Sequence, residues 1–205
     1  MRLPKAIEKL INSFEQLPGI GPKTAARLTF YLLHTPQAFL DNFGEAIGNL
    51  KKNTVECSIC HNVSETDPCS VCVDPNRDKR VICVVEQPLD ILSIERTNQY
   101  RGVYHVLHGV INPLQNVSPE EIKIGELINR VRSNEQILEI ILATGSGMEG
   151  EATAMYIAKK IRELKNKETE KIKISRLGQG LSNGTDLEYA DEKKIFQALE
   201  GRKDY

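Results

Sequence analysis

The chain has 205 residues, of which 40% are hydrophobic and 27% charged, with 27 Lys and Arg against 28 Asp and Glu. This length suits one large domain or two to three small ones, and it buries enough surface to fold without a disulfide scaffold. No apolar run approaches the ~20 residues that cross a bilayer, and no stretch after Met1 resembles a signal peptide, so we expect a cytoplasmic protein. The net charge of −1 provides no global basic field, so any contact with nucleic acid must be local.

Charge and composition change along the chain, which predicts separate domains. Residues 1–52 carry seven basic residues against four acidic ones, whereas residues 53–76 carry four acidic residues and no Lys or Arg. Apolar residues at helical spacing come first, then a cysteine-bearing loop, then alternating apolar strands and helices. We therefore predict a multi-domain α/β protein with four parts: a helical domain over 1–53, a metal module over 54–76, a parallel-sheet domain over 77–175 and a C-terminal segment over 176–205.

The helical domain is predicted to contain two helices joined by a glycine hairpin. Apolar residues recur at helical spacing over 3–17 and again over 23–33, and Pro22 suits the first position of the second helix. Between the helices, Gly19 and Gly21 flank one apolar residue, so the backbone can approach a ligand with no side chain in the way. The free N–H groups at the start of the second helix favour an anion, and phosphate is the natural candidate.

Two basic residues follow this hairpin. Lys23 and Arg27 are four positions apart in the first turns of the helix, so both can reach one strand of a nucleic-acid backbone. An ordinary Pro/Gly turn is the alternative interpretation, but LPGIGPKTA at 17–25 resembles the helix-hairpin-helix motif, whose known use is sequence-independent DNA binding. One such motif engages few phosphates, so binding should be weak, salt-dependent and useful only in several copies, which points to an oligomer. A third helix over 37–50 adds packing surface within the subunit or against a partner.

Four cysteines, Cys57, Cys60, Cys69 and Cys72, form two C-x-x-C pairs separated by eight residues. Each pair presents two thiolates to one point, and four thiolates fill a tetrahedral shell with no open position, so we predict one structural Zn²⁺ per chain. Its binding should contribute much of the folding free energy of so small a module. The alternatives are an iron–sulfur cluster and disulfides, which a cytoplasmic chain would keep reduced. His61 is surplus to this shell and is expected to be a surface loop residue.

Four apolar runs, separated by helical patterns, indicate strands. Cys83 lies in the first run and is predicted to be a small buried hydrophobe. Alternation of strand and helix predicts a mostly parallel sheet flanked by helices. The predicted strands are 81–85, 102–107, 137–143 and 172–175, and the helices are 89–96, 119–131 and 149–164.

Ligand sites of such sheets lie beyond the carboxyl ends of the strands. Four acids fall there: Glu86 and Asp90 follow the first strand, and Glu149 and Glu151 follow the third. Convergent carboxylates can hold Mg²⁺ for phosphoryl chemistry. Alternatively, Glu149 and Glu151 are favourable first-turn acids of a helix, and Asp90 lies on a solvated helix face.

This arrangement resembles a Toprim domain, the Mg²⁺-binding module of topoisomerases and primases, which pairs a glutamate after the first strand with Asp-x-Asp after a later one. Glu86 fits the first position and Glu149 with Gly150 fits the tail of the second motif, but Gly145 and Gly147 stand where aspartates are expected. Much of the metal cage is therefore missing. We interpret the module as non-catalytic, with an acidic rim that has become a docking surface, and Mg²⁺ at these acids is the less favoured alternative.

The segment GVINP at 109–113 and the tail over 176–192 complete a larger pattern. Together with the hairpin, the cysteines and EGEATA at 149–154, they make the chain similar from end to end to the RecR family of bacterial recombination mediators. The resemblance implies a non-enzymatic, ring-shaped tetramer in the bacterial nucleoid that encircles DNA and works with RecO and RecF. Its task would be to load RecA onto strands coated by single-strand-binding protein.

The resemblance also assigns residues. Lys23 and Arg27 would face DNA, and the C-terminal stretch 186–199 would pack on a neighbouring subunit, or else on its own sheet. Two loops depart from the family pattern: GSGM at 145–148 replaces an Asn-Pro-Thr-like sequence, and Ser182-Asn183 replaces Pro-Val. The residues expected to contact RecO are Glu86, Asp90, Glu149 and Glu151.

Two other functions remain open at this point. A small Mg²⁺-dependent Toprim nuclease would use Glu86, Glu149 and Glu151 to hydrolyse phosphodiesters. A protein-interaction adaptor would never touch DNA.

Overall fold

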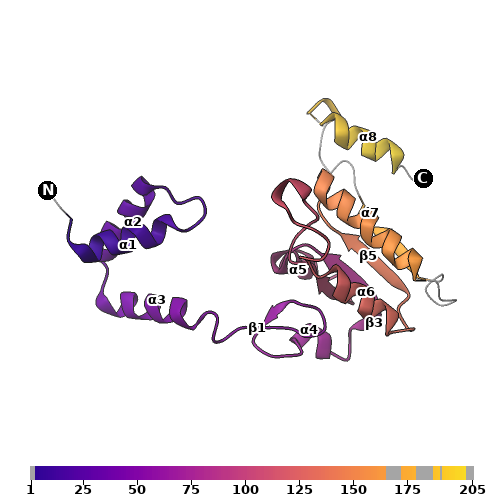
Figure 1. Ribbon diagram of the computed structural model, residues 1–205, viewed down its shortest axis with the longest axis horizontal. Coiled ribbons are helices and arrows are strands. Elements are labelled where there is room, and N and C mark those ends of the chain that lie inside the picture. Colours follow the sequence, from indigo (N-terminus) through magenta and orange to yellow (C-terminus); the bar gives the residue numbers. More distant parts are fainter. Residues whose placement is uncertain (1–2, 165–171, 179–186, 190, 202–205) are drawn as a thin grey trace. The chain divides into compact units, whose positions relative to one another are not determined.

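A computed structural model describes residues 3–164, 172–178, 187–189 and 191–201. The chain forms two compact units, Met1–Asn53 and Thr54–Tyr205, which are described separately (Figure 1). Ser182 and Asn183 lie outside the described residues, as does part of the predicted C-terminal segment. None of the helices in the described ranges has the length and hydrophobicity that a bilayer span requires.

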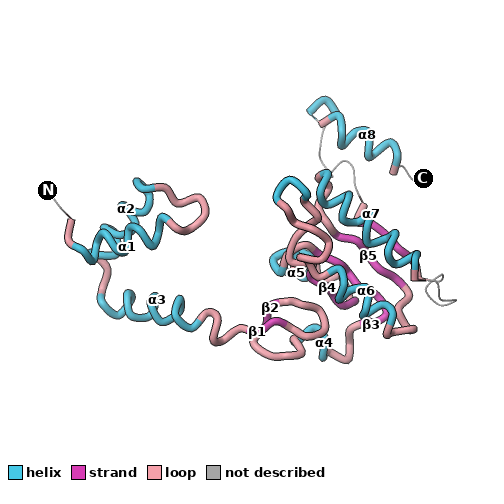
Figure 2. Tube along the Cα trace, in the orientation of Figure 1, coloured by secondary structure: helices cyan, strands magenta, loops and turns pink. Residues whose placement is uncertain are grey.

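The N-terminal unit is helical. It consists of α1 (Lys5–Glu15), α2 (Pro22–Leu33) and α3 (Gln37–Asn49), close to the predicted bounds (Figure 2). Pro22 occupies the first turn of α2, where its missing N–H costs no hydrogen bond. Ala25 and Thr29 of α2 are buried, whereas neither α1 nor α3 has a fully buried residue. This unit therefore has a small core and a large exposed apolar surface.

A small module opens the second unit. Strands β1 (Val55–Glu56) and β2 (Val63–Ser64) pair antiparallel, and the short helix α4 (Ser70–Val73) follows. One cysteine pair lies in the turn between the strands, and the other lies at the start of α4. The Val106 N–H donates to the Cys60 carbonyl at 2.8 Å, so the module joins the sheet through backbone atoms.

Within the described ranges, the sheet domain has four strands, all parallel, in the order β4-β3-β5-β6. The strands are β3 (Asp78–Val85), β4 (Gly102–Val106), β5 (Glu139–Ala143) and β6 (Lys173–Arg176). Helices α5 (Pro88–Glu95), α6 (Ile124–Arg132) and α7 (Met148–Glu163) connect them, and α8 (Glu192–Glu200) follows (Figure 1). The predicted parallel α/β architecture is confirmed.

One predicted helix begins later than expected. The pattern over 119–131 predicted a helix from residue 119, but α6 begins at Ile124. The preceding residues form turns because the Lys123 N–H donates to the Leu107 carbonyl at 2.9 Å, at the end of β4. This bond ties the segment to the sheet.

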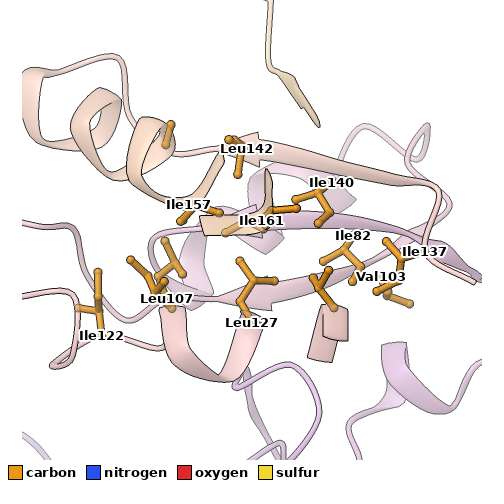
Figure 3. Close-up of a cluster of buried hydrophobic side chains, with 14 residues drawn as sticks. Ile82, Val103, Leu107, Ile122, Leu127, Ile137, Ile140, Leu142, Ile157 and Ile161 are labelled. Atoms are coloured by element: carbon orange, nitrogen blue, oxygen red, sulfur yellow. The ribbon is translucent and has the colours of Figure 1, made fainter. Parts of the chain in front are cut away.

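The sheet buries both of its faces. Side chains alternate along a strand, so Ile82 and Val84 lie in one apolar cluster, and Cys83 and Val85 lie in the other. The first cluster packs against α6 and α7, and Figure 3 shows it; the second includes Ile91 of α5. Burial on both faces explains the continuous apolar runs in the sequence. Cys83 is buried, as predicted.

A candidate DNA interface, a zinc centre and an acidic rim

The hairpin between α1 and α2 exposes its backbone. Gly19 has φ +79°, a left-handed conformation that a side chain would strain. Gly21 precedes α2 in extended conformation, and no side chain in the described part of the chain caps the helix. A Cβ atom built at either glycine would meet nothing within 4 Å, so the surface is open to an approaching ligand. The first turn of α2 thus offers N–H groups and the positive end of the helix dipole.

Lys23 and Arg27 are both exposed in the first turns of α2. Their spacing places them on the same face of the helix. The structure therefore combines two cations with the open glycine backbone, which is an arrangement suited to a phosphate chain. Contact of these four residues with DNA stays a prediction.

The four cysteines form a compact, buried cluster. Their Sγ atoms all lie within 4.8 Å of one another, and no cysteine is more than 6% exposed. The Cys57 and Cys72 Sγ atoms are 3.9 Å apart, and those of Cys60 and Cys69 are 3.5 Å apart. Tetrahedral zinc with Zn–S bonds of about 2.3 Å separates its sulfurs by roughly 3.8 Å. The cluster fits zinc and leaves no position for a substrate.

Thiol ionisation differs within the cluster. Burial raises the pKa of Cys57, but N–H groups of Cys69, Cys60 and Ile59 outweigh it and lower this pKa to about 7. Burial raises the pKa of Cys69 to about 11. A hydrogen bond with Cys72, together with burial, also raises the pKa of Cys60. Zinc must therefore displace protons from part of this cluster when it binds.

His61 is not the surface loop residue that the sequence suggested. Its backbone has φ +61° and its side chain is only 12% exposed. Nδ1 lies 2.6 Å from Glu56 Oε1, and the ring meets His105 edge-on at 5.2 Å. The His61 carbonyl also lies 2.6 Å from Nε2 of His108. The residue fixes the zinc module to the sheet, a role that sequence spacing did not reveal.

The four acids of the predicted rim have different partners. The Gly145 N–H donates to Glu86 Oε1 at 2.6 Å. Asp90 accepts a hydrogen bond from the Gln87 N–H at 2.8 Å and so completes the capping box of α5. The sequence had offered a ligand site or a solvated helix face for this residue. Glu149 and Glu151 are exposed and lie in the first turn of α7, which is the alternative position that the sequence analysis gave for them. Among the described residues, only the cysteine cluster has the geometry of a group of three or more metal ligands.

Arg176 is a rim residue that the sequence did not indicate. Its guanidinium donates to the carbonyls of Leu142 and Thr144, to Thr144 Oγ1 at 2.7 Å and to the Gly145 carbonyl at 2.9 Å. It also pairs with Glu151 at 2.8 Å. A fixed cation therefore holds the loop that replaces the Asp-x-Asp segment of a Toprim domain. No sequence signal marks it, because its partners are mostly backbone carbonyls that meet it only in the folded sheet.

Family models of known proteins match three successive parts of the chain. The family model for the RecR helix-hairpin-helix matches residues 7–50, and the family model for the RecR four-cysteine zinc finger domain matches residues 54–74. The family model for the Toprim domain matches residues 80–178. The recombination protein RecR of Ligilactobacillus salivarius (strain UCC118) is 47% identical over 204 residues, with 100% of both chains covered. The predicted structural zinc site is confirmed by the zinc-finger match and by the cysteine geometry.

Proposed function

Because the chain belongs to the RecR family of recombination proteins, we propose that it is a non-enzymatic mediator that acts with RecO and RecF to load RecA onto DNA coated by single-strand-binding protein. Its place of action would be nucleoid DNA in the bacterial cytoplasm. The family and the helix-hairpin-helix match support a DNA-binding role in recombination and repair. The observation that carries the proposal is the exposed glycine backbone followed by two cations on α2.

DNA binding would proceed through the sugar-phosphate backbone. The uncapped N–H groups after Gly21 and the helix dipole would attract one phosphate, and Lys23 and Arg27 would neutralise its neighbours on the same strand. Such contacts carry no base-sequence information, so binding would be sequence-independent. Each hairpin would contribute few ion pairs, and its affinity would fall steeply with salt.

Weak single sites require several copies, so the working form is proposed to be a ring-shaped homotetramer around DNA. Exposed apolar surface supports self-association. On α3, Phe39, Phe43 and Ile47 are spaced four residues apart and are 49%, 41% and 61% exposed, and the two phenylalanine rings stack at 6.2 Å. Near the C-terminus, Tyr189 and Phe196 are 78% and 60% exposed. Apolar side chains gathered in this way on soluble proteins mark interaction surfaces.

The acidic rim is proposed to bind RecO through Glu86, Asp90, Glu149 and Glu151. Large apolar side chains accompany these acids: Leu89, beside Asp90, is 73% exposed, and Met148, beside Glu149, is 82% exposed. Acids interspersed with apolar side chains suit a basic protein surface, because charge guides encounter and apolar contact adds affinity. Arg176 provides the fixed positive charge that holds the loop, so this function needs no Mg²⁺ at the rim.

The test is DNA binding measured against salt concentration. The double variant Lys23→Ala, Arg27→Ala of the full chain should weaken binding to every DNA sequence tested, because phosphate contacts are lost. The slope of log affinity against log salt should fall by about 0.9 for each phosphate contact removed. Lys5→Ala with Lys9→Ala is the matched control, since these two exposed cations are also four residues apart on a helix, α1. Unaltered affinity in the α2 variant would discredit the hairpin site.

A Mg²⁺-dependent nuclease is the second candidate, favoured by the Toprim match over 80–178. Its test is incubation of DNA with the protein and Mg²⁺ or Mn²⁺. Robust cleavage that Glu86→Gln abolishes would overturn the non-enzymatic assignment, whereas the mediator proposal predicts intact DNA in both samples.

A further inference from the structure

Arg130 of α6 lies at the edge of the sheet where the zinc module attaches. β4 is an edge strand of the described sheet, so its outer backbone groups can bind other elements. The Tyr104 carbonyl accepts from Arg130 Nη1 at 2.7 Å, and the Val106 N–H donates to the Cys60 carbonyl at 2.8 Å. Two residues along a strand span ~7 Å, and their backbone groups point to the same side. The guanidinium and the backbone of one cysteine are thus neighbours along one edge.

The charge of Arg130 has no acidic partner of its own. In the described part of the chain, no carboxylate forms an ion pair with it. Burial lowers the pKa of Arg130, and the nearby Cys72, Cys60 and Cys57 oppose this shift. A guanidinium nevertheless stays protonated at neutral pH. A part-buried cation therefore lies beside the cysteine cluster, bound two residues along the same strand edge from the backbone of Cys60.

The zinc centre would carry a buried negative charge that a nearby cation can compensate. Four thiolates around Zn²⁺ leave a net double negative charge, and these cysteines are buried. Buried charge is costly unless an opposite charge or hydrogen bonds compensate it. Groups outside the ligand shell that supply such compensation strengthen metal binding.

We propose that Arg130 is the counter-ion of the zinc–thiolate centre, acting from the sheet domain to strengthen zinc binding in the neighbouring module. Arg130 does not ligate the metal; it is a positioning residue whose fixed charge acts on the sulfurs. The affinity of the module for zinc then depends on a helix far along the chain, and zinc binding in turn holds the module against the edge of β4.

The test compares Arg130→Lys, which keeps the charge, with Arg130→Gln, which removes it and keeps a hydrogen-bond donor. Zinc affinity of the full chain is measured at one fixed pH by competition with a chromophoric chelator. Arg130→Gln should lower the affinity roughly 10- to 100-fold, the usual effect of changing a group that supports a metal ligand. Arg130→Lys should stay within a few-fold of the parent. Arg132→Gln is the control, because Arg132 is an exposed cation in the last turn of the same helix and should change zinc affinity little.

Two results would overturn the proposal. One is parental zinc affinity in Arg130→Gln, and the other is an equal loss in the Lys and Gln variants, which would make the Tyr104 hydrogen bond the cause. If Arg130→Gln does not fold, Arg130→Met replaces it, and zinc release to excess chelator is timed from the loaded protein. Faster release than from Arg130→Lys supports the counter-ion role, and equal rates refute it.

Discussion

His105 should make the folded protein sensitive to acid, and His105→Gln should remove that sensitivity. The side chain is fully buried in β4, with Nε2 2.7 Å from the Lys123 carbonyl and no hydrogen-bond partner at Nδ1 among the described residues. Burial lowers its pKa from 6.5 to about 3, and the neighbouring Arg130, His61 and His108 also disfavour the charged ring. Glutamine keeps an N–H donor for the Lys123 carbonyl but takes up no proton.

The size of the effect follows from proton linkage. Below pH 6.5 the unfolded chain binds a proton at His105 that the folded chain excludes until about pH 3. Stability is therefore complete above the unfolded pKa and is lost as the pH falls through this window. At pH 5 the loss is about 2 kcal/mol, and the full loss of about 5 kcal/mol for this pKa difference is reached only below pH 3.

The assay is urea unfolding of both proteins with saturating zinc at several values from pH 7.5 to pH 5. Acid also weakens zinc binding, but it does so in the parent and in the variant alike. The difference between their free energies of unfolding therefore isolates the contribution of His105. We expect this difference to shift by about 2 kcal/mol in favour of the variant across the range. Parallel pH profiles would refute the reasoning, because they would show that the folded protein accommodates a charged imidazole at this position.

Two further predictions concern the rim and the zinc module. Gly150→Ala should lower the free energy of unfolding by about 1–3 kcal/mol, because the new methyl group overlaps the Gly145 backbone. Gly125→Ala, which meets nothing within 4 Å, should instead raise it by about 0.4–1 kcal/mol. Denaturant unfolding measures the change in the free energy of unfolding of each variant. Equal changes would show that the backbone at Gly145 shifts at little cost to accommodate the methyl group. Cys57→Ser should release zinc and lower the thermal unfolding temperature, because the metal contributes to folding of this module. A variant with parental thermal unfolding and no bound metal would contradict the structural role.

The features predicted correctly from the sequence are those whose information is local. The cysteine spacing places two thiols in each turn, so a tetrahedral site follows without knowledge of the fold. The start of α2 at Pro22 follows from the restricted backbone of proline. Unbroken apolar runs that alternate with helical patterns predicted a parallel sheet flanked by helices, and the structure confirms this.

The features that escaped prediction depend on contacts between distant segments. His61 was expected to be a surface loop residue because it is surplus to a filled four-cysteine shell, whereas its ring packs against His105 of β4. The start of α6 depended on a bond between Lys123 and the end of β4. Arg130 and Arg176 both donate to backbone carbonyls, which carry no sequence signal.

In the acidic rim, side chains of the protein itself hold the loop after β5. In the Toprim pattern a cation would hold the loop after the third strand, and here Gly145 and Gly147 cannot supply carboxylates. Glu86 holds the Gly145 N–H from one side, and Arg176 holds the Gly145 carbonyl from the other. Hydrogen bonds and a covalently attached guanidinium thus take the structural place of a dissociable ion. Because that cation cannot leave, the order of this loop should not depend on the Mg²⁺ concentration, and the rim would be preformed for a protein partner.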